Sequence, residues 1–509
     1  MFCNSTGNQT INIIPALQFG IKNTVIISTD YAEESRLTKR LIDLMEKRKI
    51  NVSTEKIVNH EEKNVKMLTE KLIMLSRQYN KVVWNISGGQ KIPTVALHDA
   101  FQKRIAAGFS DDMILYVEGN DPAIWYYGKD FRTESVRSSV ALELDELLKL
   151  SGSRIYEATK IYPSDSADTK RNLEAGSKAL IFYKSSDLFR EAFFSLMSPP
   201  EQMPRSMKAL EKQIKDILNN IKPNVDKLPL KKSGYENFEE TIIYAVQQIN
   251  NSKTIQEAKD GINKLKIIEK PKEIYNDYWN SIKRACIDSA KKMLTENREP
   301  LISQKINNAN KKQLISQIQD IGGEVKASTE EILYRNDVIK FSSIGGNADL
   351  FEWMVSASVI DSVRKHPEIR DCISEVHWNV KTQKSSAGNA KHDSEIDVVI
   401  TTKYGTLIVL EAKTYDFSGD TAKSKESIAY KKSGPFAKAI IVGPLIRTIV
   451  KEKGNGEKEV PPYIKGKTKD QEETANQNGI EYCYLDEIES MLRNKLGLKK
   501  DCGNDNHRH

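Results

Sequence analysis

The chain contains little cysteine and no long apolar run, and these two absences exclude several classes of protein. Its five cysteines are odd in number, widely spaced and never arranged as CxxC: Cys3, Cys286, Cys372, Cys483 and Cys502. A disulfide framework and a zinc knuckle are therefore not expected, and the thiols fit a reducing compartment. No run approaches the ~18 apolar residues of a membrane helix, and no charged and then apolar leader opens the sequence. We therefore expect a cytoplasmic protein.

What is present fits a globular protein of several domains. The 509 residues are 39% hydrophobic and 29% charged, and about 150 residues per domain gives roughly three domains. The formal net charge is +7, and residues 151–345 contain 32 basic and 26 acidic side chains, which accounts for +6. This excess favours a phosphate-rich partner in the middle of the chain. A lysine-rich solvated surface explains it equally well.

Strand and helix patterns alternate over residues 1–150. Buried strands are predicted at 24–28, 82–86 and 113–117, with helices that begin near Leu37 and Pro93. Strands separated by helices indicate a parallel, doubly wound sheet.

The rest of the chain divides at about residue 330. Residues 151–330 repeat apolar side chains three and four positions apart, as in Ile242, Ile243, Val246 and Ile249, which predicts a helical region. A similar series is Leu210, Ile214, Ile217 and Leu218. Residues 331–509 return to mixed α/β patterns. Their predicted elements are a helix, three strands and a surface loop: 350–363, 396–400, 407–410, 439–442 and 452–473.

The sharpest chemical signal is a predicted hairpin within residues 394–413. Lys403-Tyr404-Gly405 fits a three-residue turn with glycine in the left-handed position. Centring the turn on Tyr404 places Asp397 opposite Glu411, with Cβ atoms about 5 Å apart. A bulge would shift this register by one residue. Lys413 points to the same face as Glu411, because side chains alternate along a strand.

Two facing carboxylates on otherwise apolar strands repel one another unless a cation joins them. A divalent cation would be held by Asp397, Glu411 and the backbone carbonyl of Ala412, with positions left for water and phosphate. It would acidify a bound water, and Lys413 could orient that water or neutralise charge on a phosphate. Hydrolysis of phosphodiester bonds is the natural reaction. The alternative is a surface hairpin with solvated carboxylates, against which strands that are apolar on both faces argue.

These residues resemble the core of PD-(D/E)xK nucleases. The matching positions are Asp397 on one strand and Glu411-Ala412-Lys413 on the next. The resemblance implies a restriction-endonuclease-like α/β domain over 331–509, a Mn²⁺ or Mg²⁺ cofactor, and one more acidic residue from a preceding helix. Glu352 matches that place and is implied as a catalytic residue and metal ligand. Asp349, one helical turn earlier, is its rival.

A glycine turn near the N-terminus points to ligand binding. Ser87-Gly88-Gly89-Gln90-Lys91 follows a predicted strand and precedes a helix, where backbone amides favour phosphate. Ser28-Thr29-Asp30 follows another strand, so both segments should lie at the carboxyl edge of one sheet, where open α/β sheets bind ligands. The alternative is a tight turn that only closes a strand–helix unit.

The two loops together resemble CARF domains, the cyclic-oligoadenylate sensors of type III CRISPR systems, whose usual turn is Thr-Gly-Gly-Thr-Lys. Ser87 keeps a hydroxyl at the first position, whereas Gln90 replaces the second threonine. A CARF domain followed by a PD-(D/E)xK nuclease is the layout of the Card/Can effector nucleases, which the chain resembles over roughly 1–150 and 340–450. This implies a Rossmann-like sensor domain over 1–150 and a helical linker or insert over 151–330.

The resemblance also implies how the protein works. Two chains would pair through their sensor domains and hold one cyclic tetra-adenylate across the two-fold axis. The ligand would favour a cutting arrangement of the nuclease domains, which cleave DNA, RNA or both. Two other hypotheses stay open. One is a non-catalytic nucleotide-sensing regulator that binds nucleic acid through its basic middle region. The other is a stand-alone restriction-type enzyme.

Overall fold

The structure is a computed structural model of the chain. It describes residues 1–58, 61–117, 123–196, 240, 242–249, 251, 255–267, 280, 283–291, 308–325, 339–340, 347–384, 394–414, 417, 419–433, 437–447, 451–452, 458–459 and 471–498. In these ranges no helix is long and apolar enough to span a membrane. The chain forms two compact units. The first is Met1–Ser186, Gln317–Gly323 and Phe341–His509, and the second is Asp187–Ser316 and Glu324–Lys340.

The first unit begins with a seven-stranded sheet in the order β3-β2-β1-β4-β5-β6-β7. Its strands are β1 (Phe2–Asn4), β2 (Asn23–Ser28), β3 (Asn51–Lys56), β4 (Val83–Asn85), β5 (Met113–Val117), β6 (Ala123–Tyr127) and β7 (Glu134–Arg137). Neighbours from β3 to β5 pair in parallel, and β6 and β7 add an antiparallel edge. The predicted parallel sheet is confirmed. β1, β3 and the antiparallel edge are not predicted from the sequence. β1 has only three residues and β3 is mostly exposed and polar, so neither shows the apolar run of a buried strand.

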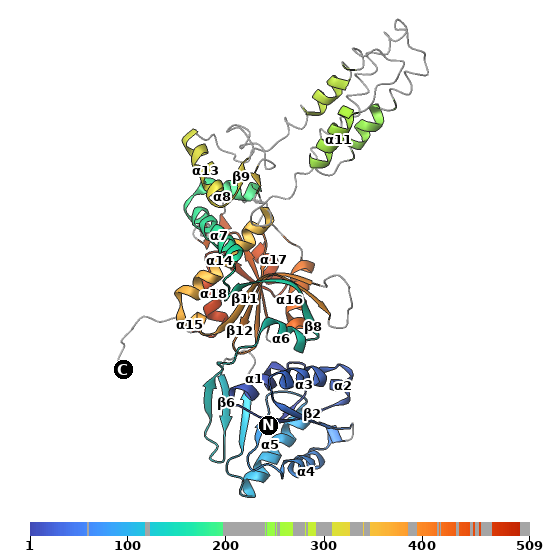
Figure 1. Cartoon of the computed structure of the whole chain (residues 1–509), viewed down its shortest axis with the longest axis vertical. Coiled ribbons are helices and arrows are strands. Elements are labelled where there is room, and N and C mark those ends of the chain that lie inside the picture. The colour runs from blue at the N-terminus through green and yellow to red at the C-terminus, as the bar shows by residue number, and fades with distance from the viewer. Residues whose placement is uncertain are drawn as a thin grey trace, which may run out of the picture. The chain divides into compact units, whose positions relative to one another are not determined.

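Helices cover both faces of this sheet (Figure 1). They are α1 (Thr10–Gln18), α2 (Asp30–Glu34), α3 (Leu37–Lys47), the 3₁₀ turn Glu61–Lys63, α4 (Val65–Ser76), α5 (Lys91–Ala106) and α6 (Leu144–Leu150). Val25 and Ile27 of β2 pack with α4 and α5, whereas Ile26 packs with α1, α3 and α6. Alternate side chains of one strand therefore enter two different cores.

A second sheet follows in the same unit, with six strands in the order β17-β14-β13-β12-β11-β8. The strands are β8 (Ser153–Tyr162), β11 (Ile373–Lys384), β12 (Ser394–Thr402), β13 (Leu407–Ala412), β14 (Lys438–Gly443) and β17 (Glu481–Tyr484). The helices around it are α7 (Ala167–Ser185), α14 (Asn347–Lys365), α15 (Pro367–Arg370), α16 (Gly419–Ser433), α17 (Gln471–Gln477) and α18 (Ile488–Lys495). The predicted helix at 350–363 and the three predicted strands are confirmed as α14, β12, β13 and β14.

Strand β8 lies within the range where only helices are predicted. It pairs antiparallel with β11 at the edge of the second sheet. Its side chains are mostly half-buried or exposed, so its sequence lacks both an apolar run and a regular alternation. Of the predicted loop 452–473, the structure describes a short antiparallel pair, β15 (Lys451–Glu452) with β16 (Lys458–Glu459), and the start of α17.

The second unit is helical in the residues described, apart from two short strands. Its elements include α8 (Asp187–Leu196), α11 (Ile255–Ile267), the first part of α13 (Asn308–Asp320), and β9 (Glu324–Val325) paired with β10 (Ile339–Lys340). The predicted apolar series from Ile242 to Ile249 lies in a helix over 242–249, with Ile242, Val246 and Ile249 buried. The series from Leu210 to Leu218 lies outside the described residues.

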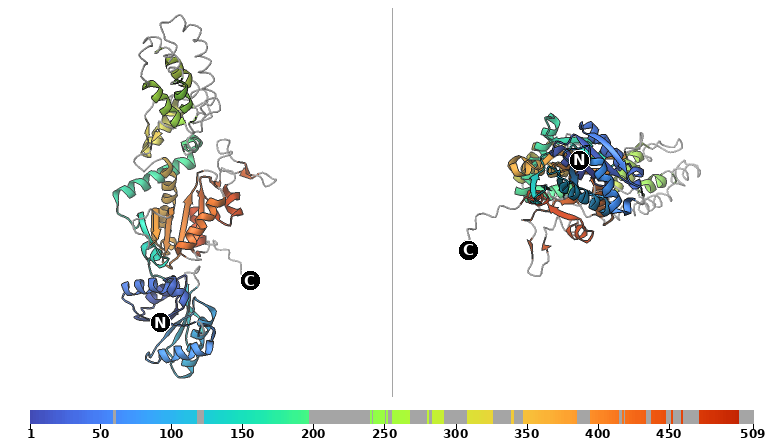
Figure 2. Two further views of the ribbon diagram at one scale, coloured as in Figure 1. Left: turned by 90° about the vertical axis from the view of Figure 1, so that its right-hand side faces the viewer. Right: turned by 90° about the horizontal axis from the view of Figure 1, so that it is seen from below.

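The two sheets of the first unit share one hydrophobic core. Ile14 of α1 and Leu147 of α6 belong to the same buried cluster as Val399 of β12 and Val409 of β13. Figure 2 shows the blue N-terminal part and the orange C-terminal part of this unit next to one another. α6 therefore packs beside β8 of the second sheet, and Ile14 of α1 lies close to Gly405 in the turn of the predicted hairpin.

Candidate functional site

The hairpin forms with the predicted register. Val398 pairs with Leu410, and the ladder continues without a bulge to Thr401 opposite Leu407. At the turn, Gly405 has a φ of +78° and its N–H donates to the Thr402 carbonyl at 3.1 Å. A positive φ is strained for any residue with a side chain, so glycine fixes the turn and with it the register.

Extending this register by one step brings the predicted carboxylates together. The backbone N–H of Ala412, next to Glu411, donates to Asp397 Oδ2 at 2.8 Å. Lys413 Nζ donates to Glu411 Oε1 at 2.6 Å. Asp397 is 9% exposed and Glu411 is 2% exposed. The hairpin therefore buries two carboxylates on neighbouring strands and places the half-buried Lys413 ammonium group against one of them.

The electrostatic environment ties these groups to one another. Burial lowers the pKa of Lys413, but the negative charges of Glu411 and Asp397 outweigh it and hold that pKa above its ordinary value. Lys413 therefore stays charged. Its ammonium group is the cation that balances the hairpin carboxylates in this structure.

Helix α14 adds two acidic residues beside the hairpin. Burial, followed by the charges of Asp397 and Asp349, raises the pKa of Glu352 to about 8. Glu352 Oε2 accepts a hydrogen bond from Trp378 Nε1 at 2.9 Å. The pKa of Asp349 is also raised, first by burial and then by the charge of Glu395. Glu352 thus lies in the field of the hairpin carboxylates, as its predicted role requires.

The donor chemistry of this group suits a hard divalent cation. Asp397, Glu411 and Glu352 offer carboxylate oxygens. Burial, and after it the neighbouring carboxylates, raise the pKa of Glu352, and a cation would favour its charged form. Their present arrangement is more open than a closed metal site. Within the described ranges, no three Asp, Glu, His or Cys side chains surround a common point at metal-binding distance.

The second predicted site lies at the carboxyl edge of the first sheet. β2 and β4 flank β1 in parallel, so the segments that follow them, from Thr29 and from Ile86, leave the same edge. Gly89 has a φ of +102°, and a Cβ there would lie 2.7 Å from Asn4 Cβ. A Cβ on Gly88 would lie 2.3 Å from Ile11 Cδ1. Gly89 is therefore required by its positive φ and its close approach to β1, whereas a side chain at Gly88 would require Ile11 of α1 to move.

Two predicted ligand-binding hydroxyls point into the domain. Ser28 is fully buried, and its hydroxyl bonds with Glu33 and, at 2.6 Å, with Thr38. Ser87 Oγ accepts from the backbone N–H of Val117 at 2.8 Å and donates to Asn85. In this structure these hydroxyls hold the loops in place. Their direct contact with a ligand stays a prediction.

The other predicted residues lie closer to the surface. Thr29 caps α2 by accepting from Ala32 N at 3.2 Å. Asp30 forms an ion pair with Lys56 at 2.8 Å. Gln90 and Lys91, at the start of α5, are exposed.

The loop after β1 is a part of the site that sequence reasoning missed. Residues of Ser5–Gln9 line two cavities, of about 490 and 200 Å³. Ser87 and Gly88 line the larger cavity, whereas Thr29, Gly89 and Gln90 line the smaller one. The available signal was a short apolar start, Met1-Phe2-Cys3, followed at once by a polar, glycine-containing segment.

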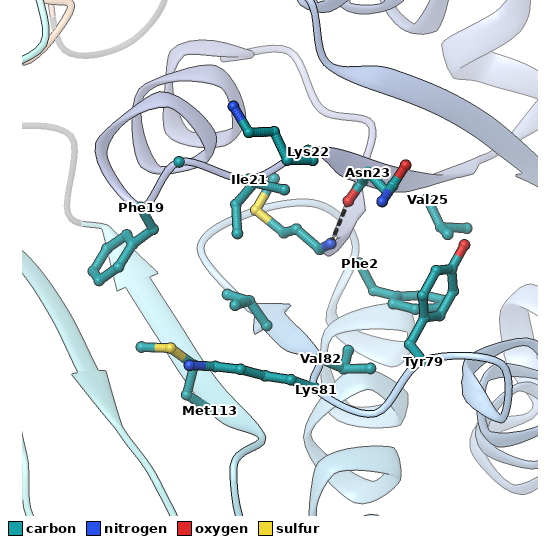
Figure 3. A pocket seen from close by; sticks show the side chains of 13 residues that line it. Phe2, Phe19, Ile21, Lys22, Asn23, Val25, Tyr79, Lys81, Val82 and Met113 are labelled. Atoms are coloured by element: carbon teal, nitrogen blue, oxygen red, sulfur yellow. Dashed lines mark hydrogen bonds between the residues drawn. The ribbon is translucent and has the colours of Figure 1, made fainter.

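A further cavity, of about 310 Å³, opens at the opposite edge of the same sheet (Figure 3). It lies where the parallel strands begin and is lined by Phe2, Val25, Tyr79, Met113 and other mostly apolar residues. Since open α/β sheets bind ligands at the carboxyl edge, this cavity stands apart from the predicted site.

Comparison with known proteins shows what the N-terminal part of the chain is similar to. Residues 7–127 match the family model of the Card1 CARF domain. No curated protein sequence matches the chain.

Two solved structures share the fold over nearly the whole chain. Protein VC1899 from Vibrio cholerae aligns over 97% of this chain and 96% of its own, with a TM-score of 0.50 and 12% identity. Can2 from Sulfobacillus thermosulfidooxidans, in complex with cyclic tetra-adenylate, aligns over 97% and 99%, with a TM-score of 0.52 and 13% identity. The predicted α/β fold class is thereby confirmed. Residues 7–127 of this chain are thus similar to CARF domains of the Card1 type.

Proposed function

We propose that this protein is a cyclic-oligoadenylate-activated nuclease that cleaves phosphodiester bonds of DNA or RNA in type III CRISPR antiviral defence. The CARF domain supports the sensing half of the proposal. The fold shared with Can2, whose structure contains cyclic tetra-adenylate, supports that molecule as activator. The protein would act in the cytoplasm as a homodimer paired through its CARF domains.

The domain roles follow the predicted boundaries, except for β8 and α7. Residues 1–150 would form the sensor, 331–509 together with β8 and α7 the nuclease domain, and the rest of 151–330 a helical linker or insert. The ligand would lie along the carboxyl edge of the first sheet. The residues proposed to hold it are Ser28, Thr29, Asp30, Ser87, Gly88, Gly89, Gln90 and Lys91.

One observation supports the catalytic half most strongly. Asp397 and Glu411 meet in a buried position on strands that are otherwise apolar, and the half-buried Lys413 lies beside them. Burying charged groups is unfavourable for stability, so a fold gains nothing from placing them there. A role in chemistry explains their presence. This is the arrangement expected when charge must be held close to a reacting phosphate.

Mg²⁺ or Mn²⁺ would be held by Glu352, Asp397, Glu411 and the carbonyl of Ala412, and when bound would supply an acidified water and compensate phosphate charge. Lys413 would donate to a phosphate oxygen as negative charge develops there. Its ammonium group stays charged because two carboxylates raise its pKa. The Glu352 carboxyl, with a pKa of about 8, holds its proton near neutral pH in the cation-free protein.

The test is plasmid cleavage with Mn²⁺, with and without cyclic tetra-adenylate. Wild type is compared with Lys413→Ala and with Lys403→Ala, a control in the turn of the same hairpin. Cleavage that requires both the ligand and Lys413, and that survives Lys403→Ala, is the expected result. Ligand-independent cleavage would indicate a restriction-type enzyme. If no DNA is cut, single-stranded RNA is tested in the same reactions.

A non-catalytic regulator is the second candidate function. The observation in its favour is that the described acidic side chains do not surround a common metal position. It predicts ligand binding without cleavage of either nucleic acid. Wild-type protein that binds cyclic tetra-adenylate yet cuts neither plasmid nor RNA would establish this alternative.

A further inference from the structure

The larger cavity at the carboxyl edge has two walls that come from distant parts of the sequence. One wall is the loop after β1 together with Ser87 and Gly88 of the glycine turn. The other includes Tyr430 and Lys431, which lie on α16 beside the second sheet. The cavity measures about 490 Å³, within the usual range for small-molecule sites.

The charged side chains that line this cavity are all positive. Arg40 and Lys431 line it, and none of its lining residues is acidic. Arg40 is partly buried, and burial together with the neighbouring charge of Arg36 lowers its pKa. A Cβ on Gly152 would lie 2.6 Å from Arg40 Cζ, so the glycine allows the guanidinium group to lie against the backbone. Among the described residues, no carboxylate forms an ion pair with Arg40 or Lys431.

Aromatic side chains accompany the two cations. Tyr31 and Tyr430 line the cavity and keep 69% and 61% of their surface exposed. Exposed tyrosines of this kind offer faces on which bases can stack, and cations beside them bind phosphate. Two cations that pair with no carboxylate in the described part of the chain, tyrosine faces and backbone amides near a glycine turn together fit a ligand with phosphates and planar bases.

We propose that the nucleotide site is completed by α16, with Arg40 and Lys431 binding ligand phosphate and Tyr430 stacking on a base. This inference rests on the proposed sensing function and extends it to a helix outside the CARF domain. α16 packs against β13 and β14, and its Ala429 lies in the core shared by both sheets. A ligand held by Lys431 therefore contacts the helix that supports the strand ending in Glu411 and Ala412.

The test measures binding of cyclic tetra-adenylate to the full chain by isothermal titration calorimetry. The variants are Lys431→Ala, Tyr430→Ala and, as a matched control, Lys423→Ala, an exposed lysine on the same helix outside the cavity lining. Loss of a charged contact to phosphate should weaken binding roughly 10-fold or more for Lys431→Ala. Lys423→Ala should bind like wild type. Thermal melts of all variants should agree, because these side chains are exposed.

Each outcome decides between the two proposals. If wild type binds and Lys431→Ala binds equally well, the role of α16 is wrong and the sensing function stands. Lys91→Ala then locates binding on the glycine turn alone. If wild type binds neither cyclic tri-, tetra- nor hexa-adenylate, the sensing function and the α16 inference are both overturned. If Lys431→Ala and Lys423→Ala weaken binding alike, the effect is general electrostatic attraction, and the specific contact is refuted.

Discussion

Glu375 links α6 to the second sheet through a buried carboxylate, and its replacement gives a quantitative prediction. The side chain is 7% exposed and lies on β11. It accepts from the backbone N–H of Leu144, the first residue of α6, at 2.8 Å and from Lys160 Nζ. His377 Nε2 lies 3.2 Å from Glu375 Oε2. Because α6 packs in the shared core, this carboxylate ties α6 and that core to the sheet that contains the hairpin.

The contribution of the Glu375 carboxylate to the free energy of folding follows from its pKa. Burial raises the pKa of Glu375, but the hydrogen bonds from His377, Lys160 and Leu144 outweigh it and lower the pKa to about 2. Against an ordinary value of 4.5, this corresponds to about 3 kcal/mol of folding free energy at pH 7. A depressed carboxyl pKa stabilises the protein fully above pH 4.5. That stabilisation disappears as the pH falls toward 2.

Glu375→Gln removes the charge and keeps the shape. We expect it to lower the free energy of unfolding by about 2–3 kcal/mol at pH 7, and to remove part of the acid sensitivity that wild type shows below pH 4.5. Urea unfolding at pH 7 and pH 3.5, followed by tryptophan fluorescence, measures both effects. Ligand-stimulated cleavage should weaken in parallel. Equal unfolding midpoints for the two proteins at pH 7 would refute the assignment of a stabilising buried ion pair.

Two further substitutions test how the core positions these sites. A Cβ on Gly176 of α7 would lie 2.3 Å from the Trp353 carbonyl oxygen of α14. Gly176→Ala should therefore push the two helices apart, destabilise the protein by about 1–3 kcal/mol and reduce cleavage. An unchanged melting temperature of this variant would contradict the prediction. Asp112 accepts from Arg104 Nε at 2.7 Å in a fully buried pair, so Asp112→Asn should cost about 3–5 kcal/mol, whereas Asp111→Asn at the exposed neighbour should leave chemical unfolding unchanged.

The sequence alone was sufficient wherever neighbouring residues decide the structure. Gly405 is required by the positive φ of a three-residue turn, and that turn determines which residues of β12 and β13 face one another. Short apolar runs in the sequence indicate the buried strands. Polar segments that follow parallel strands must lie at the same edge of the sheet. The CARF resemblance was also local, because it depends on a glycine turn between a strand and a helix.

The tertiary structure decided what depends on distant parts of the chain. The inward direction of Ser28 and Ser87 depends on partners such as Thr38 and Val117, which no local pattern identifies. Strand β8 is stable only because β11 supplies its hydrogen bonds. The cavity wall on α16 exists because two sheets share one core. Packing of this kind joins residues hundreds of positions apart, and the free energy that holds them together belongs to the whole core rather than to any segment of sequence.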